Sequence, residues 1–330
     1  MNILWPLLLS IIGFIVTRAL MPVTINLGRK LGIIGIDIHK PWKPQIPATG
    51  GLGLATGILI PLIIHAALYP STTILAAFLS LILALILGLF DDLYDISPKL
   101  KIFMGALAGL PLVILGTYNP RPYVPFLGQL RITIIYPILI LIAYAVLINA
   151  ANMIDTHNGL LPSSVLLIIC SIIPLQIYLV SKGLIDFLSI AISAIAIGSL
   201  LSYLPFNIFP AKVFNGNTGS HFLGALLALI TIYSRLEIVM IISIMPIVIN
   251  GFSLILSVGG LRKKEQIERP VIIQDDGSIE FSRKPKSPIT LVQLLTLRGK
   301  IYEPEIVLSV VTLMYIFCSL GVITFIFTYP

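Results

Sequence analysis

Long apolar stretches alternate with short polar segments along the whole chain. A helix needs about 20 apolar residues to cross a hydrocarbon core of about 30 Å. Up to ten stretches can serve, the fourth and eighth being short: residues 4–23, 50–69, 72–89, 103–117, 132–148, 160–180, 187–204, 220–232, 238–258 and 306–329. In lipid the backbone satisfies its own hydrogen bonds only as a helix or a closed barrel, and barrel alternation is absent here. The pattern predicts an all-α, polytopic membrane protein with about ten transmembrane helices.

The composition excludes other classes of protein. Of the 330 residues, 57% are apolar and 11% are charged, against roughly 25% charged in soluble domains. A mean hydropathy of +1.04 also excludes a disordered chain, which lacks such an excess of apolar side chains. Because no internal repeat is evident, we expect residues 1–330 to form a single transmembrane domain.

The basic residues are distributed unevenly between the two sets of loops. If the amino terminus is outside, residues 24–49, 90–102, 149–159, 205–219 and 259–305 share the cytoplasmic side and hold 16 Lys and Arg, against 4 in the opposite loops. This asymmetry explains the net charge of +7 without a nucleic-acid partner. The same loops hold 12 of the 14 acidic residues, which the charge rule does not require. We therefore expect chemistry at the cytoplasmic face.

Three polar segments on this side carry candidate chemistry. In residues 88–101, the adjacent Asp91 and Asp92 precede Asp95, Lys99 and Lys101. Two neighbouring carboxylates at a membrane boundary favour binding of a divalent cation or a reacting proton. The alternative is that they cap the end of a helix at the membrane interface. Residues 149–160 carry only oxygen and imidazole ligands, of the kind that suits magnesium: Asn149, Asn152, Asp155, His157 and Asn158. An ordinary loop with a helix cap, and for His157 a hydrogen-bonded loop histidine, are the alternatives.

The third segment, residues 206–224, leads from a Gly-rich turn directly into a helix. The free N–H groups of such a helix start favour phosphate, and Gly216 and Asn217 lie there with Lys212 nearby. The alternative is an ordinary turn between two helices, in which Gly, Asn and Ser are common.

Two basic loops complete this face. They are residues 31–53 and the run Arg262, Lys263, Lys264 and Arg269. Each lysine alone reads as topogenic charge attracted to anionic membrane lipids. Together with the oxygen-rich segments, the two loops indicate a site for a metal-chelated, multiply phosphorylated substrate. Within the loop of residues 259–305, Val271–Ile273 and Ile279–Phe281 around Asp276 and Gly277 predict a small hairpin, so this loop is partly folded.

At these motifs the chain resembles the polyprenyl-phosphate N-acetylhexosamine-1-phosphate transferase family. The resemblance covers nearly the whole chain and is strongest to the eukaryotic and archaeal branch, the dolichyl-phosphate GlcNAc-1-phosphotransferases. It rests on GIDIHK with IPATGG, FDDLYD with Lys101, NAANMIDTHNGL, FNIFPAKVFNGNTGS and TLVQLLTLRGKIYEPEI.

The resemblance implies a ten-helix membrane enzyme that transfers GlcNAc-1-phosphate from UDP-GlcNAc to dolichyl or another polyprenyl phosphate and releases UMP. This step begins lipid-linked glycan assembly for protein N-glycosylation. It implies magnesium, with manganese as a substitute, and an active site on the cytoplasmic face of an archaeal cell membrane or a eukaryotic endoplasmic reticulum membrane. A homodimer is left open.

By motif matching, Asn152 and Asn217 hold the metal and Asp91 with Asp92 lie beside the reacting phosphates. Lys101 contacts phosphate, and Asn158 faces uracil. We assign Asn149, Lys212, Gly216 and the segment 262–269 to substrate binding.

Two departures from the family pattern affect these assignments. Asn217 stands where the family usually has Asp, and we hypothesise that Asp155 compensates as an additional metal ligand and catalytic acid. RKKEQIER replaces the Arg-His-Arg signature.

Other functions and routes remain open from the sequence. A bacterial-type undecaprenyl-phosphate transferase with another UDP-sugar is the nearest alternative, and an ion-coupled transporter is the alternative from another class. Which of Asp91 and Asp92 aligns or deprotonates the nucleophile is also open, as is a covalent aspartyl-phosphate route.

Overall fold

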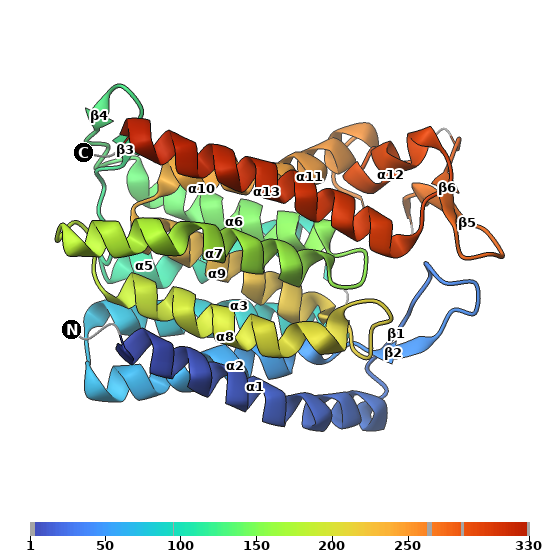
Figure 1. The fold of residues 1–330 in the computed structure, drawn as a ribbon, viewed down its shortest axis with the longest axis horizontal. Helices are drawn as coiled ribbons and strands as arrows, with labels where there is room; N and C mark the ends of the chain where they lie inside the picture. The colour runs from blue at the N-terminus through green and yellow to red at the C-terminus, as the bar shows by residue number, and fades with distance from the viewer. Residues whose placement is uncertain (1–3, 95, 263–265, 285–286, 329–330) are drawn as a thin grey trace.

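The computed structural model describes residues 4–94, 96–262, 266–284 and 287–328. Asp95, Lys263 and Lys264 lie outside these residues. The helices are α1 (Leu4–Leu31), α2 (Gly50–Leu68), α3 (Thr72–Tyr94), α4 (Pro98–Ala108), α5 (Leu110–Ile114), α6 (Tyr136–Ile154), α7 (Leu160–Ser181), α8 (Leu188–Asn207), α9 (Gly216–Ser234), α10 (Glu237–Ser243), α11 (Met245–Ser257), α12 (Leu291–Leu295) and α13 (Glu303–Thr328), with a 3-10 turn η2 (Thr296–Arg298). The long helices lie side by side in one bundle, with both chain ends at the same end of it (Figure 1).

Proline fixes where several of these helices begin or break. α4, α5, α6 and α11 each have proline in the first turn, where its missing N–H is no loss. Pro246 also breaks the ninth apolar stretch, because α10 and α11 meet at a bend of 60° beside it.

All ten expected stretches fall on helices, but the expected number of spans is only partly supported. Within the described residues, seven helices are long and apolar enough to cross a membrane, or eight if α10 and α11 form one bent span. The fourth stretch is divided between the short α4 and α5. The eighth, α9, begins with polar residues and is buried along nearly its whole length, so it does not need an apolar surface toward lipid.

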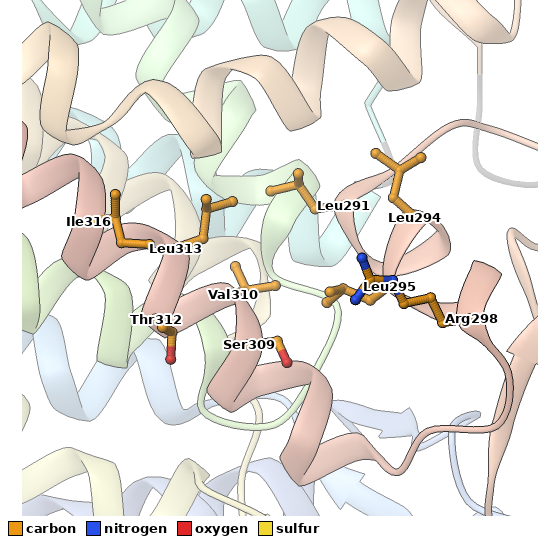
Figure 2. A pocket seen from close by; sticks show the side chains of 9 residues that line it. All are labelled: Leu291, Leu294, Leu295, Arg298, Ser309, Val310, Thr312, Leu313 and Ile316. Atoms are coloured by element: carbon orange, nitrogen blue, oxygen red, sulfur yellow. The ribbon is translucent and has the colours of Figure 1, made fainter.

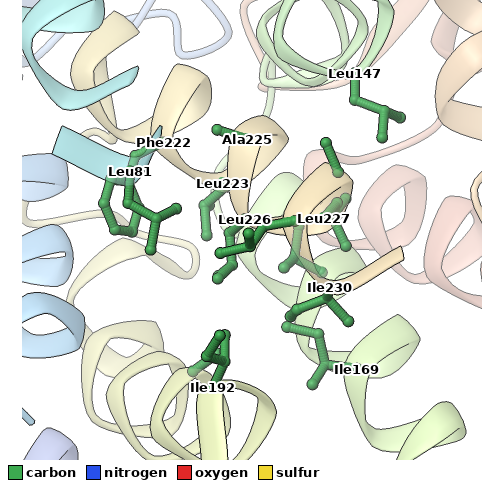
Figure 3. Packing of buried hydrophobic residues seen from close by; sticks show 14 of the residues in the cluster. Leu81, Leu147, Ile169, Ile192, Phe222, Leu223, Ala225, Leu226, Leu227 and Ile230 are labelled. Carbon is green, nitrogen blue, oxygen red and sulfur yellow. The ribbon is translucent and has the colours of Figure 1, made fainter. Parts of the chain in front are cut away.

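α9 is the centre of the core. Figure 3 shows Leu223, Leu226 and Ile230 of this helix pointing among side chains of the surrounding helices α3, α6, α7 and α8. Gly224 lets α9 approach α6 closely, since an added Cβ would lie 2.6 Å from the Ile148 Cα atom. Such small residues allow helices to pack where lipid supplies no hydrophobic drive for association.

Three small antiparallel hairpins connect the helices. β1 (Ile34–Ile36) pairs with β2 (Gln45–Pro47), β3 (Tyr123–Val124) with β4 (Gly128–Gln129), and β5 (Val271–Ile273) with β6 (Ile279–Phe281). The hairpin expected within residues 259–305 is confirmed at the expected bounds. The other two hairpins carry no comparable turn signal in the sequence.

The five loops that the charge asymmetry groups together meet at one end of the bundle. Polar contacts join Asp92 to Asn217, Asp155 to Asn215, and Glu303 to both Lys40 and Asn158. The hairpins β1–β2 and β5–β6 project from this end, and β3–β4 lies at the other (Figure 1). The fold therefore brings together the same five loops that the distribution of Lys and Arg groups on one side of the membrane.

Candidate active site

Asp92, in the last turn of α3, caps the start of α9. Its carboxylate accepts the Asn217 N–H at 2.7 Å and the Thr218 N–H at 2.8 Å, and the Thr218 hydroxyl donates to it at 2.5 Å. A negative charge is favourable here because the unpaired N–H groups give a helix start its positive end. Both oxygens of Asp92 are therefore engaged in holding the turn.

Gly216 makes this junction sterically feasible. Its φ is +66°, a left-handed conformation that side chains disfavour. An added Cβ would lie 2.4 Å from the Ala48 carbonyl oxygen and 2.9 Å from Asp92 Oδ2. The glycine predicted for phosphate approach thus also lets α3 and residue 48 close on the turn.

Asp91 has different surroundings from its neighbour Asp92. The Asp91 side chain is buried, and its Oδ1 has no hydrogen-bond donor among the described residues. Lys101 Nζ lies 2.8 Å from Asp91 Oδ2 as an ion pair, and His221 Nε2 lies 3.8 Å from the same oxygen. The acidic pair is thus divided between a structural carboxylate and one with acceptor capacity to spare.

The two asparagines assigned to the metal are in direct contact. Asn152 Nδ2 donates to Asn217 Oδ1 at 2.7 Å and to Ser220 Oγ at 2.8 Å. His221 Nδ1 lies 2.7 Å from the Asn217 carbonyl oxygen, and His221 also faces Asp91. The fold therefore brings α3, α6 and the start of α9 to one polar centre.

Asp155 lies beside this centre but contacts a different asparagine. Asn215 Nδ2 donates to Asp155 Oδ1 at 2.7 Å, and the Tyr203 hydroxyl donates to Asn215 Oδ1 at 2.6 Å. Burial raises the pKa of Asp155 to about 7; the Asn215 hydrogen bond opposes this shift and the negative charge of Asp92 adds to it. Asp155 is thus near Asp92 and titrates close to neutrality.

A second buried cluster ties three loops together, and we call Asp37, Lys40, Asn158 and Glu303 the buried quartet. Lys40 pairs with Asp37 and, at 2.9 Å, with Glu303, and the three side chains are each 3% exposed. The Asn158 N–H donates to Glu303 Oε1 at 2.8 Å, and Asn158 Nδ2 donates to Asp37 Oδ2 at 3.2 Å. Asn158, the residue assigned to uracil, is thus held from both sides by carboxylates.

Two histidines stack next to the quartet. The His39 and His157 rings lie 4.2 Å apart at an angle of 18°. Burial lowers the pKa of each to about 3, with the neighbouring His157 adding to the shift of His39 and Lys40 adding to that of His157. The two rings are therefore neutral at physiological pH, and His157 Nδ1 shares a hydrogen bond of 2.8 Å with the Thr156 hydroxyl.

The remaining predicted site residues lie outside these clusters. Asn149 donates to the Ala145 carbonyl of its own helix at 2.8 Å, one turn before Asn152. Lys212, Arg262 and Arg269 are exposed. Arg269 lines a cavity of about 710 Å³ between the β1–β2 connection and β5, together with Lys43 and Lys284. The structure thus groups the acidic and amide residues closely and leaves these basic ones at the surface around them.

Sequence reasoning missed several members of these clusters. Asp37 and Glu303 lie in motifs that carry the family resemblance, and Asn215 and His221 flank the Gly-Asn turn. The sequence did carry a signal for these residues, because each basic loop also contains an acidic residue. A loop whose basic residues serve only to set the membrane topology does not need one. Lys40 in particular is buried in an ion pair and so is not a surface charge for lipid head groups.

The donor set suits a hard divalent cation. Among the described residues, no three His, Cys, Asp or Glu side chains form a metal cluster, so an ion would depend on amide oxygens as well as carboxylate. The Asp91 carboxylate, with Oδ1 unpartnered among the described residues, and the Asn152–Asn217 amide pair supply such donors. Magnesium takes one or two protein carboxylates and leaves its other positions to water and phosphate, so these residues fit it.

Comparison with known proteins decides the family. The sequence profile of glycosyl transferase family 4 matches residues 74–235, the part that carries Asp91, Asn152 and Asn217. The chain is also similar to the phospho-N-acetylmuramoyl-pentapeptide-transferase of Clostridium beijerinckii, with 30% identity over 254 residues, 70% of this chain and 75% of that one. The chain belongs to glycosyl transferase family 4.

Further relatives of this glycosyl transferase family 4 protein carry provisional names. One from Sulfolobus acidocaldarius, provisionally a UDP-N-acetylglucosamine–dolichyl-phosphate N-acetylglucosaminephosphotransferase, is 29% identical over 331 residues, 98% of this chain and 97% of that one. One from Bacillus subtilis, provisionally an undecaprenyl-phosphate N-acetylglucosaminyl 1-phosphate transferase, is 25% identical over 274 residues, 82% of this chain and 74% of that one. The resemblance to polyprenyl-phosphate sugar-1-phosphate transferases is confirmed.

Proposed function

We propose that this protein transfers GlcNAc-1-phosphate from UDP-GlcNAc to dolichyl or a related polyprenyl phosphate and releases UMP, with magnesium as cofactor. The observation that carries the proposal is the pairing of Asp91 with Lys101 beside the Asn152–Asn217 amides, because it combines a carboxylate with one oxygen to spare, a cation and amide oxygens. The named relative from Sulfolobus, similar over nearly the whole chain, supports this donor and acceptor.

In the proposed reaction, a phosphate oxygen of the lipid attacks the phosphorus that bears the sugar. A new P–O bond forms, the bond from this phosphorus to the bridging oxygen breaks, and UMP leaves with that oxygen. Two polyanions must meet, so positioning and neutralisation of charge supply most of the catalysis. Magnesium, held by Asn152 and Asn217 with an adjacent carboxylate, would supply Lewis-acid stabilisation of the phosphate charge.

The side chains at the polar centre have separate roles in this proposal. Asp92 is engaged with the backbone of α9, so it holds the turn that carries Asn217. Asp91 has one oxygen, Oδ1, without a partner among the described residues, which suits it to align or deprotonate the lipid phosphate, while Lys101 contacts phosphate. Asp155 lies near Asp92, and when ionised it would add the negative charge that the hypothesis of compensation for Asn217 requires.

The transporter alternative is less well supported. Ion-coupled transporters bind their ions near the bilayer midplane, at interruptions within helices. In the described helices, the acidic residues instead occupy the first or last turn, as Asp91 and Asp92 do in α3 and Glu303 and Glu305 do in α13. This distribution favours chemistry at the membrane surface.

The test is a transfer assay with the purified full chain, UDP-[³H]GlcNAc, magnesium and dolichyl phosphate. We expect label in the lipid phase and an equal amount of UMP, both abolished by EDTA and restored by added magnesium. Undecaprenyl phosphate and other UDP-sugars form parallel arms that test the bacterial-type alternative. If the folded protein gives no lipid product with any UDP-sugar, the proposed transfer is wrong.

A further inference from the structure

A groove of about 440 Å³ lies between α12 with η2 and the first half of α13. Figure 2 shows its walls: Leu291, Leu294 and Leu295 on one side, and Val310, Leu313 and Ile316 on the other. None of these side chains belongs to the polar centre or the buried quartet. The groove is thus a separate feature of the molecule.

The two hydroxyl groups in the walls of the groove already have hydrogen-bond partners. The hydroxyls of Ser309 and Thr312, which also line it, donate to the Glu305 and Leu308 carbonyls of their own helix at 2.7 and 2.8 Å. A water-soluble ligand would find few hydrogen bonds here, whereas a hydrocarbon chain would lose none. The chemistry of the walls therefore selects an apolar occupant.

The groove runs along a helix that qualifies as a membrane span. Leu308 is 67% and Ile316 49% exposed, so this side of α13 is an apolar surface available to lipid. The groove residues of α13 follow its first residue, Glu303, by one to four turns, or roughly 9–20 Å along the helix axis. This depth corresponds to the outer part of a hydrocarbon core, just below the head groups.

One residue that lines this groove, Arg298, carries a positive charge. Arg298 lines it together with the leucines of α12 (Figure 2). No described residue forms an ion pair with Arg298, whereas the nearby Lys300 faces the carboxylates of Asp276 and Glu280 at 4.0 and 3.6 Å. An arginine presents several donors in a fork that matches a phosphate group. The groove is thus complementary in charge to an anionic head group.

We propose that this groove binds one anionic membrane phospholipid, with its phosphate on Arg298 and an acyl chain over Val310, Leu313 and Ile316. The apolar walls, the depth along α13 and the charge of Arg298 select the same occupant independently. Such a lipid would fasten α12, and with it the loop of residues 259–302, to α13 at the membrane surface. The proposal does not depend on the proposed transfer reaction, because its site and its readout are different.

The experiment is native mass spectrometry of the purified full chain titrated with phosphatidylglycerol or with phosphatidylcholine of the same acyl chains. We expect the wild type to retain one phosphatidylglycerol more tightly than phosphatidylcholine. Arg298→Gln should weaken phosphatidylglycerol binding about fivefold, which corresponds to about 1 kcal/mol. Lys300→Gln is the matched control, since it removes a charge two residues away that already faces carboxylates, and it should leave binding unchanged.

A second variant tests the seat of the acyl chain. Thr312 is exposed within the groove, so Thr312→Trp fills it without disturbing the core, and it should abolish retention of the lipid while the melting temperature of the delipidated protein is kept. Equal affinity for the two lipids, equal effects of Arg298→Gln and Lys300→Gln, or unchanged retention in Thr312→Trp would each overturn the proposal. Preferential retention of polyprenyl phosphate at this groove would also overturn it.

Discussion

At the scale of single residues, adjacent carboxylates have different duties because their neighbours differ. Asp92 accepts three hydrogen bonds from the start of α9, whereas Asp91 forms an ion pair with Lys101 through Oδ2 and keeps Oδ1 without a partner among the described residues. The two neighbouring aspartates point in different directions. One therefore holds the helix start, and the other is available for the reaction.

Substitution of the two carboxylates should separate stability from activity. Asp92→Ala removes a helix cap and a favourable charge, so we expect a loss of about 2 kcal/mol in the free energy of unfolding together with lost transfer. Asp91→Asn should melt near the wild-type temperature, because Lys101 is 20% exposed and water can solvate its released charge. Its transfer rate should fall by about 10²-fold or more. Thermal unfolding and the transfer assay on both variants test this, and full activity in Asp91→Asn would assign the reaction to another group.

Asp155 should make the stability of the protein depend on pH near neutrality. Its folded-state pKa is raised to about 7, so the folded state holds a proton that an unfolded Asp releases near pH 3.9. This contribution to stability is complete below the unfolded pKa and is lost as the pH rises through about 7. Asp155→Asn keeps an acceptor for Asn215 without the charge, so it should melt above the wild type at about pH 8, by a margin that shrinks steadily as the pH falls toward about 4.

The measurement is a pH series of melting temperatures without added divalent cations. Parallel curves for the two proteins would contradict the raised pKa. The same variant tests whether Asp155 compensates for Asn217: full transfer with unchanged magnesium dependence would show that it does not.

At the scale of elements, the start of α9 depends on one glycine for two reasons. Gly216 has a positive φ and no room for a Cβ. Gly128, the first residue of β4, has a φ of +70° but nothing within 4 Å of an added Cβ. A substitution at Gly128 therefore tests backbone strain alone, whereas one at Gly216 tests strain together with steric overlap.

We expect Gly128→Ala to destabilise the protein by about 1–2 kcal/mol, the strain of a left-handed alanine. Gly216→Ala should cost distinctly more, because the Ala48 carbonyl and α3 would also have to move. Melting temperatures of the two variants in detergent check this difference. Equal losses would mean that the turn can open without harm.

The buried quartet is the corresponding junction between α13 and the other loops. Glu303→Ala leaves Lys40 buried with one carboxylate fewer and removes the acceptor of the Asn158 N–H, so we expect a loss of about 3–5 kcal/mol. Glu305, on the same helix, is exposed, and its carboxylate accepts the Tyr302 N–H at 2.9 Å. Glu305→Ala should therefore cost about 1 kcal/mol or less. Similar losses in the two variants would show that the quartet does not stabilise the fold.

At the scale of the whole molecule, the fold collects the polar loops at one end and both chain ends at the other. The bundle itself does not say which end faces the cytoplasm. The excess of Lys and Arg in the grouped loops, 16 against 4, predicts that the end with the polar centre is cytoplasmic.

Cysteine labelling in sealed right-side-out vesicles tests this orientation. In a background of Cys170→Ser and Cys318→Ala, Gln129→Cys should react with an impermeant maleimide at once. Asp275→Cys, in the exposed turn of β5–β6, should react only after the vesicles are opened. The reverse pattern would place the polar centre outside and contradict the expected orientation.

The sequence by itself determined the positions of the helices and which loops lie together. Apolar runs of sufficient length must be helical in lipid, and each crossing alternates the side of the next loop, so both features follow from one-dimensional information. The β5–β6 hairpin was predictable for a similar reason, because Asp276-Gly277 and its apolar flanks lie close together in the chain. The motifs also identified the segments of the polar centre, since oxygen ligands in apolar surroundings are costly unless they are used.

Only the tertiary structure decided which of these polar groups contact one another. Asp92 and Asn217 are 125 residues apart in the chain, and Lys40 and Glu303 are 263 apart, so no local pattern relates them. The same holds for the choice of Asn215 rather than Asn152 or Asn217 as the partner of Asp155. These pairings are fixed by how closely α3 and α6 pack against α9 and α13 packs against α7 and α10, and packing depends on side-chain shapes along all these helices at once.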